Sequence, residues 1–207
     1  MAYNKLFLRI ILSVIIFVIF FIFYFLLTKY LFVLVLFIYL MIFYEVIKYF
    51  NYYNFFVFIY LFFSFLTFLY YVLFIYNKDI FLIFVLIIFL FDTFSYFFGK
   101  LFGTIKLIPK ISPNKTLEGL IGGFLSSIIF TVTYHYLFNQ YFILNFIIFN
   151  LLIVVFAFSG DLFQSFIKRK SKIKDSSNLL PGHGGFFDRM DGYLLAVFIL
   201  PFQGMIL

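Results

Sequence analysis

The chain has 207 residues, of which 66% are hydrophobic and only 11% are charged. A soluble domain is nearer half apolar, so this composition excludes an ordinary soluble protein. Cysteine is absent, which excludes disulfides, thiol catalysis and thiolate metal sites.

Apolar runs of about 20 residues, the length that crosses a hydrocarbon core, recur along the chain. The first run follows Lys5 and Arg9 but lacks a small-residue cleavage site, so we interpret it as a retained span and not as a signal peptide. We expect an all-α integral membrane protein with about seven transmembrane helices. The expected spans are 6–27, 31–50, 55–76, 80–98, 119–138, 142–160 and 192–207.

The distribution of positive charge predicts the orientation. Two connections are long, 99–118 and 161–191, and seven spans place both on the same side. If that side is cytoplasmic, thirteen of the fifteen cations lie inside, and Lys29 and Lys78 lie outside. Cytoplasmic loops carry such an excess of Lys and Arg. Attraction to anionic lipid is enough to explain Lys5, Arg9 and Lys48, but it does not explain cations placed among glycines and carboxylates.

Asp92 interrupts the fourth span. A carboxylate inside a membrane segment costs roughly 2.5 to 3.5 kcal/mol near the centre and less near the end, so it favours a polar cavity. The alternative is an interfacial aspartate that reaches water. Because residues three and four apart share a helix face, Ser95, Tyr96 and Gly99 could line one stripe with Asp92.

The segment 112–123 combines a turn signal with a helix start. Ser112-Pro113-Asn114 is typical of a turn, and Thr116 can cap the helix that follows. A helix N-terminus preceded by Lys115 also suits an anion. Gly119, Gly122 and Gly123 would form a smooth face, for which the alternative is simple close packing of helices.

Residues 161–191 form a dense polar segment in an otherwise apolar chain. Asp161, Asp188 and Asp191 could converge on Mg²⁺, which takes a few oxygen ligands, and Asp188 and Asp191 would share a face if their segment is helical. The alternative is that these carboxylates only offset nearby cations. Of those cations, we expect Lys168, Arg169 and Lys174 to be functional. His183 lies between glycines that allow a ligand close approach, whereas His135 is expected to be an interfacial residue on the opposite side.

One long run of residues resembles the signature of phosphatidate cytidylyltransferases, also called CDP-diacylglycerol synthases. The run comprises Ser165, Ile167, Lys168, Arg169, Lys174, Asp175, Ser177, Leu180, Pro181, His183-Gly184-Gly185-Phe186 and Asp188-Arg189-Met190-Asp191. The resemblance covers about residues 90–195. It also takes in Gly160-Asp161-Leu162, Ser112 to Thr116, Glu118-Gly119, and Asp92 with Tyr96.

The chain departs from that family pattern in places. Gln164 stands where the family usually has Glu, Ser177 where Gly is commoner, and Ser95 where Ala is commoner. The chain is also short for the family, which leaves the architecture of the bundle and a homodimer contact open.

The resemblance implies the reaction of CTP with phosphatidic acid to give CDP-diacylglycerol and pyrophosphate, as a step of phospholipid biosynthesis. It implies a multi-pass protein of the inner or plasma membrane, with the site at the cytoplasmic membrane surface and no nucleic-acid partner. We expect a single membrane domain, in which 1–79 hold spans without a motif and 80–207 hold the catalytic spans and loops.

The resemblance and the residues together assign roles. Asp161 and Asp188 are the expected Mg²⁺ ligands, and a monovalent cation such as K⁺ is left open. The expected catalytic set also includes Asp191, Lys168, Arg169, Lys174, Arg189 and His183. The expected substrate-binding residues are Ser112, Asn114, Lys115, Thr116, Ser165 and Asp92.

Other function classes fit less well. A related CTP-dependent enzyme that acts on an isoprenoid lipid phosphate is the main alternative. A CDP-alcohol phosphotransferase would need an Arg after Asp191-Gly192, where this chain has Tyr-Leu-Leu-Ala. A channel or transporter would use Asp92 and Asp161 as ion ligands and would show ion flux without CTP turnover.

Overall fold

The computed structural model describes residues 30–50, 54–138, 142–180 and 184–207, together with Val18, Ile22, Tyr24 and Phe25. Most of the expected span 6–27, and the whole of Pro181 to His183, lie outside the described residues. The chain divides into two compact units. The first unit comprises Met1–Phe65 and Lys168–Met190, and the second comprises Leu66–Ile167 and Asp191–Leu207.

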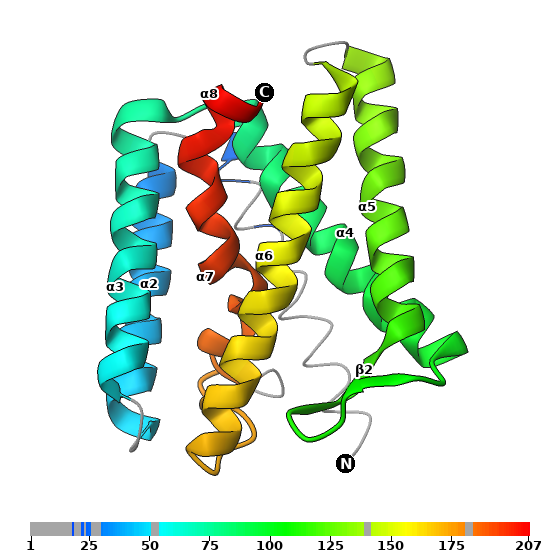
Figure 1. The fold of residues 1–207 in the computed structure, drawn as a ribbon. Helices are drawn as coiled ribbons and strands as arrows, with labels where there is room; N and C mark the ends of the chain where they lie inside the picture. Colours follow the sequence, from blue (N-terminus) through cyan, green and yellow to red (C-terminus); the bar gives the residue numbers. More distant parts are fainter. Residues whose placement is uncertain are drawn as a thin grey trace. The chain divides into compact units, whose positions relative to one another are not determined.

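Helices dominate the described chain (Figure 1). The elements are α2 (Leu31–Tyr49), α3 (Asn54–Tyr70), η2 (Tyr71–Ile75), α4 (Lys78–Phe102), β1 (Lys106–Ile108), β2 (Ser112–Thr116), α5 (Leu117–Phe138), α6 (Ile143–Lys170), η3 (Phe187–Arg189), α7 (Asp191–Ala196), η4 (Val197–Phe202) and α8 (Gln203–Ile206).

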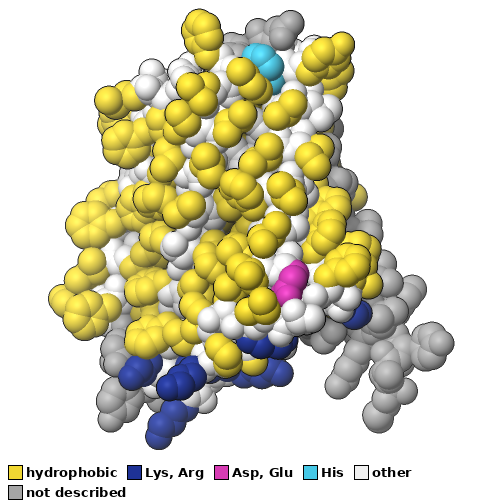
Figure 2. All heavy atoms as spheres, turned by 45° about the vertical axis from the view of Figure 1, so that its right-hand side comes forward, with side chains coloured by type: hydrophobic (Ala, Val, Ile, Leu, Met, Phe, Trp, Pro, Cys, Tyr) yellow, Lys and Arg dark blue, Asp and Glu magenta, His cyan; other side chains and the backbone are white. Residues whose placement is uncertain are grey.

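Five helices of the described residues are long and apolar enough to cross a membrane: Leu31–Tyr49, Phe55–Ile75, Lys78–Phe102, Leu117–Phe138 and Ile143–Lys170. They confirm an all-α membrane protein. The expected seventh span is a shorter helical segment, Asp191–Ile206, that includes 3₁₀ turns around Pro201. A total of seven spans therefore stays a prediction. Figure 2 shows hydrophobic side chains covering most of one face, as helices in contact with lipid require.

Two helices extend beyond their expected ends. α4 runs to Phe102 and α6 to Lys170, so the prediction that the sixth span ends at residue 160 was wrong. Asp161, Ser165 and Lys168 consequently lie on a helix and not in a loop. Hydropathy marks the lipid-embedded part of a helix, whereas the backbone hydrogen bonds of an α-helix continue into polar residues.

In the first unit, α2 packs against α3. The hydroxyl groups of Tyr39 and Ser64 form a buried hydrogen bond of 2.7 Å, and the rings of Phe43 and Phe58 stack with centroids 5.7 Å apart. A hydroxyl in a membrane helix has no water to bind, so an interhelical partner satisfies it.

In the second unit, small residues bring α4 and α5 together. Gly119 and Gly123 of α5 are buried, and an added Cβ would lie 2.6 Å from the backbone oxygen of Ser95 or of Phe91, respectively. This contact supports the packing interpretation of the glycine face. Asp92, Ser95, Tyr96 and Gly99 all lie on α4, and Tyr96 is 70% exposed, so their lining of one polar stripe stays a prediction.

A hairpin of β1 and β2 connects α4 to α5, with Lys106 opposite Thr116. The expected turn at Ser112–Asn114 was wrong, because these residues form β2. The turn lies earlier, where Ile111 N–H donates to the carbonyl of Ile108 across Pro109 and Lys110. Proline favours the second position of such a turn, and Pro113 is tolerated in β2 because a two-stranded hairpin has only edge strands.

Candidate active site

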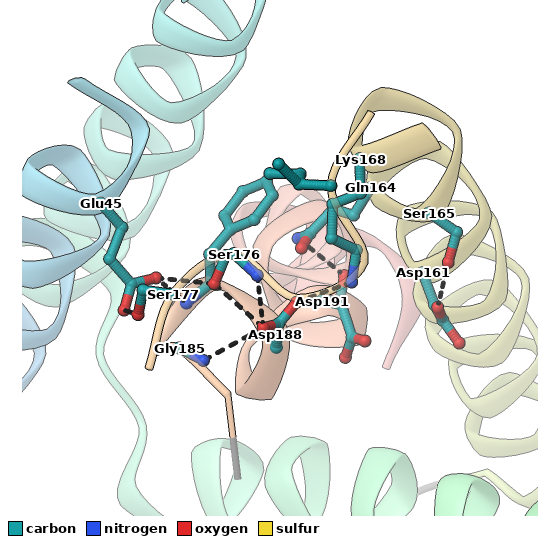
Figure 3. A network of polar contacts seen from close by, with 12 residues as sticks. Glu45, Asp161, Gln164, Ser165, Lys168, Ser176, Ser177, Gly185, Asp188 and Asp191 are labelled. Atoms are coloured by element: carbon teal, nitrogen blue, oxygen red, sulfur yellow. Dashed lines mark hydrogen bonds and ion pairs between the residues drawn. The ribbon is translucent and has the colours of Figure 1, made fainter. Parts of the chain in front are cut away.

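Asp188 is a densely bonded carboxylate of the first unit. Its Oδ1 lies 2.7 Å from Lys168 Nζ, and both side chains are nearly buried, 8% and 11% exposed. Its Oδ2 accepts hydrogen bonds from the backbone N–H of Ser176 at 2.7 Å and of Gly185 at 3.0 Å (Figure 3). Burial by itself raises the pKa of Asp188, but Lys168 and these two N–H groups outweigh it, so the pKa lies below its ordinary value.

The backbone around Asp188 is shaped for this contact. Gly184 has φ +82°, and a Cβ there would lie 2.7 Å from Asp188 Oδ2. Glycine is therefore the residue that this position requires. Asp188 belongs to the 3₁₀ turn η3, whereas Asp191 begins α7. The two residues do not lie in one helical segment, so they do not share a helix face.

The other expected cations of the first unit lie at the surface. Arg169, Lys174 and Arg189 are exposed, and Arg169 donates a hydrogen bond of 3.3 Å to the carbonyl of Ile173. Lys168, by contrast, is nearly buried and pairs with the Asp188 carboxylate. His183 falls outside the described residues.

Sequence reasoning missed Glu45 on α2. Its side chain is fully buried, and its carboxylate accepts hydrogen bonds from Ser176, Ser177, Phe186 and Phe187. A signal was available, because Glu45 is a carboxylate inside the expected span 31–50, and the insertion cost that singled out Asp92 applies to it equally.

Asp161 is the corresponding carboxylate of the second unit. Its Oδ2 lies 2.5 Å from Lys115 Nζ, with side chains 28% and 18% exposed, and its Oδ1 accepts a hydrogen bond of 3.3 Å from Ser165 Oγ. Lys115 Nζ also lies over the ring of Phe158, 4.7 Å from its centroid. The spacing of four residues on α6 explains the contact between Asp161 and Ser165.

Two further carboxylates of the second unit lie near this pair. Asp92 interacts electrostatically with Asp191, Asp161 and Lys115. A Cβ on Gly192 would lie 3.6 Å from Asp92 Oδ2, which places Asp92 beside the start of α7. The start of α7 is held by Gln164, whose Nε2 donates a hydrogen bond of 3.3 Å to the carbonyl of Asp191. The second unit thus brings together Asp92, Lys115, Asp161 and Asp191, as expected for a polar site.

The hairpin residues divide into two groups. Thr116 is buried, and its Oγ1 accepts a hydrogen bond of 3.2 Å from Gly119 N–H, which confirms its predicted capping role. Asn114 is exposed and Ser112 is half-exposed. Glu118 accepts hydrogen bonds from Thr104 N–H at 3.0 Å and from Ile105 N–H at 3.1 Å, so it anchors the entry to the hairpin.

The donor chemistry of both units suits Mg²⁺. In the described chain, no group of three or more His, Asp or Glu side chains is arranged to hold a metal ion. Mg²⁺ does not need one, because it commonly uses one or two carboxylates with water and substrate phosphate. Asp161 and Asp188 each lie beside a lysine, and each offers carboxylate oxygens to such an ion.

These features define a class: a polytopic α-helical membrane protein whose few polar residues form paired carboxylates and lysines. The match to a family model is more specific, because residues 48–205 match the cytidylyltransferase family. The chain belongs to this family, which confirms the resemblance drawn from the motif.

Curated relatives agree with that assignment. The chain is 42% identical over 106 residues to a phosphatidate cytidylyltransferase of Haemophilus influenzae, a match that covers 49% of this chain and 37% of that protein. It is 41% identical over 104 residues to the one of Thermotoga maritima, covering 47% and 38%, and 42% identical over 113 residues to the one of Staphylococcus haemolyticus, covering 53% and 42%. The chain thus spans about two fifths of the length of the relatives that it matches.

Proposed function

We propose that this protein is a phosphatidate cytidylyltransferase, which converts CTP and phosphatidic acid into CDP-diacylglycerol and pyrophosphate. Membership of the cytidylyltransferase family supports the nucleotide, and the similarity to phosphatidate cytidylyltransferases supports the lipid acceptor. The observation that carries the proposal is the pairing of two motif carboxylates with two motif lysines, Asp188 with Lys168 and Asp161 with Lys115.

The chemistry explains why such pairs are useful. An oxygen of the phosphatidate monoester attacks the α-phosphorus of CTP, the new P–O bond forms, and the bond to the β-phosphate breaks to release pyrophosphate. The nucleophile is already anionic near neutral pH, so the reaction needs charge neutralisation and positioning more than a strong base. Lysines held beside carboxylates are pre-positioned to bind phosphate oxygens.

In this proposal Asp161 and Asp188 would hold Mg²⁺, which supplies neutralisation of the triphosphate charge when bound. Lys168 and Lys115 would bind phosphate oxygens, with Arg169, Lys174 and Arg189 as further cations. Asp92 and Asp191 would support the Asp161 carboxylate. Ser112, Asn114, Thr116, Ser165 and His183 would shape the nucleotide pocket. Turnover with and without K⁺ tests a monovalent cation in the site, and the mass of the purified protein in micelles tests a homodimer.

A lipid product assay tests the proposal. Purified protein in mixed micelles with labelled CTP, phosphatidate and Mg²⁺ is expected to release pyrophosphate and form labelled CDP-diacylglycerol, and chelation of Mg²⁺ is expected to abolish both. ATP and GTP are expected to be poor donors. Preferential cytidylylation of an isoprenoid phosphate, or equal use of ATP, would contradict the named substrates.

We propose that the polar segments face the cytoplasm, because thirteen of the fifteen cations follow the positive-inside pattern. The wild type has no cysteine, so a single Asn178→Cys variant reports on its own position. Asn178 is exposed, whereas the neighbouring Ser176 and Ser177 are buried and unsuitable for labelling. In intact cells an impermeant maleimide should leave this cysteine unlabelled, and it should react after permeabilisation. Labelling from outside would overturn the orientation.

A further inference from the structure

Glu45 lies on α2, and its carboxylate accepts hydrogen bonds from Ser176, Ser177, Phe186 and Phe187. Its Oε1 accepts from Ser177 Oγ at 2.8 Å and from Phe186 N–H at 2.8 Å. Its Oε2 accepts from Ser176 Oγ at 2.9 Å and from Phe187 N–H at 3.0 Å. Each oxygen therefore binds one hydroxyl and one backbone N–H, and four donors that are far away in sequence converge on one side chain (Figure 3).

Burial of the Glu45 carboxylate costs free energy, which its hydrogen bonds must offset. Its side chain is 0% exposed, and its carboxylate is surrounded by hydroxyl and backbone N–H donors. A buried carboxylate is tolerated where hydrogen bonds replace its lost hydration. Conversely, an apolar residue at position 45 would leave the N–H groups of Phe186 and Phe187 without their acceptor, and each orphaned donor costs about 1–3 kcal/mol.

Ser176 connects Glu45 to Asp188. Its Oγ lies 2.9 Å from Glu45 Oε2 and 3.0 Å from Asp188 Oδ2, and its backbone N–H donates to the same Asp188 oxygen. A hydroxyl group has one proton, so the two carboxylates share it. The rings of Phe50 and Phe187, with centroids 5.4 Å apart, add an apolar contact between the end of α2 and the same segment.

We propose that Glu45 is a positioning residue, which fixes Ser176, Ser177, Phe186 and Phe187 and through Ser176 holds Asp188 in its reactive orientation. This role rests on the proposed cytidylyltransferase function for its catalytic consequence. It extends the site to α2, on which Glu45 lies three residues before the family match begins at residue 48. Glu45 itself is not a catalytic residue, because its carboxylate is enclosed by protein donors.

The symmetry of the contacts makes Glu45→Gln a sharp test. Whichever way the amide is turned, its NH₂ group replaces an oxygen that accepts a backbone N–H, from Phe186 or from Phe187. A hydroxyl can rotate to accept from the NH₂ group, but a backbone N–H cannot. Glutamine thus keeps the size of the side chain and opposes one backbone N–H donor in either orientation.

The experiment measures hydrogen exchange and steady-state kinetics of the full chain in micelles. Glu45→Gln is expected to speed exchange in peptides covering 176–187 and to lower kcat roughly 10- to 100-fold with a smaller change in the KM for CTP, the range typical for residues that support metal ligands. Ser177→Ala, which removes one of the four donors, is expected to speed exchange in the same peptides and to lower kcat, each by a smaller factor than Glu45→Gln.

Tyr39→Phe is the matched control, because it removes a buried hydrogen bond from the same helix toward Ser64 on α3. It is expected to leave exchange in 176–187 and kcat unchanged. Unchanged exchange in 176–187 for both Glu45→Gln and Ser177→Ala would overturn the proposal, and so would faster exchange with an unaltered kcat. If the wild type itself fails to use CTP, the proposed function fails, while the exchange data still decide whether Glu45 holds the segment.

Discussion

Asp188→Asn is expected to lower cytidylyl transfer on the order of 100-fold or more, because a metal ion contributes several kcal/mol and each 1.4 kcal/mol is a factor of ten in rate. Asparagine keeps the size of the side chain and can still accept from Ser176 N–H and Gly185 N–H. It removes the negative charge that faces Lys168 and that would bind Mg²⁺. Initial rates at increasing Mg²⁺ measure the effect.

Stability must be separated from catalysis in this experiment. Lys168 and Asp188 are both nearly buried, and removing one partner of a buried pair costs about 3–5 kcal/mol because it leaves a charge without compensation. The double variant Lys168→Met with Asp188→Asn removes that charge and is expected to regain thermal stability without regaining activity. Recovery of activity in the double variant would show that Asp188 only balances Lys168.

Asp161→Asn is expected to have a similarly large effect on turnover, on the order of 100-fold, for the same electrostatic reason. In the second unit this carboxylate is the partner of Lys115 and lies near Asp92 and Asp191. The pair is partly exposed, so its loss is expected to cost only about 0–1 kcal/mol of stability. The expected result is therefore a folded protein with little activity, measured by CDP-diacylglycerol formation and by thermal unfolding.

Asp79→Asn is a suitable control for both experiments. Asp79 is an exposed carboxylate in the first turn of α4, remote in sequence from the motif segments. Its replacement is expected to leave turnover unchanged. Near-wild-type turnover of Asp161→Asn at saturating Mg²⁺ would refute the assignment of Asp161 as a metal ligand.

Local properties of the sequence determined much of this protein. Hydropathy predicted the positions of the five described spans, because the exclusion of water from a bilayer restricts spanning segments to apolar helices. The spacing of motif residues likewise predicted the family, and the sequence pattern around Thr116 predicted a helix cap. Each of these signals is contained within one segment of the chain.

Tertiary structure alone decided which side chains meet. Lys168 pairs with Asp188 across twenty residues of chain, Lys115 pairs with Asp161, and Glu45 binds donors about 130 to 140 residues away. Hydropathy also could not show that α4 and α6 continue past the apolar region. The physical reason is that a local pattern reports the solvent around a segment, whereas a polar contact depends on which distant donor satisfies a carboxylate that the fold removes from water.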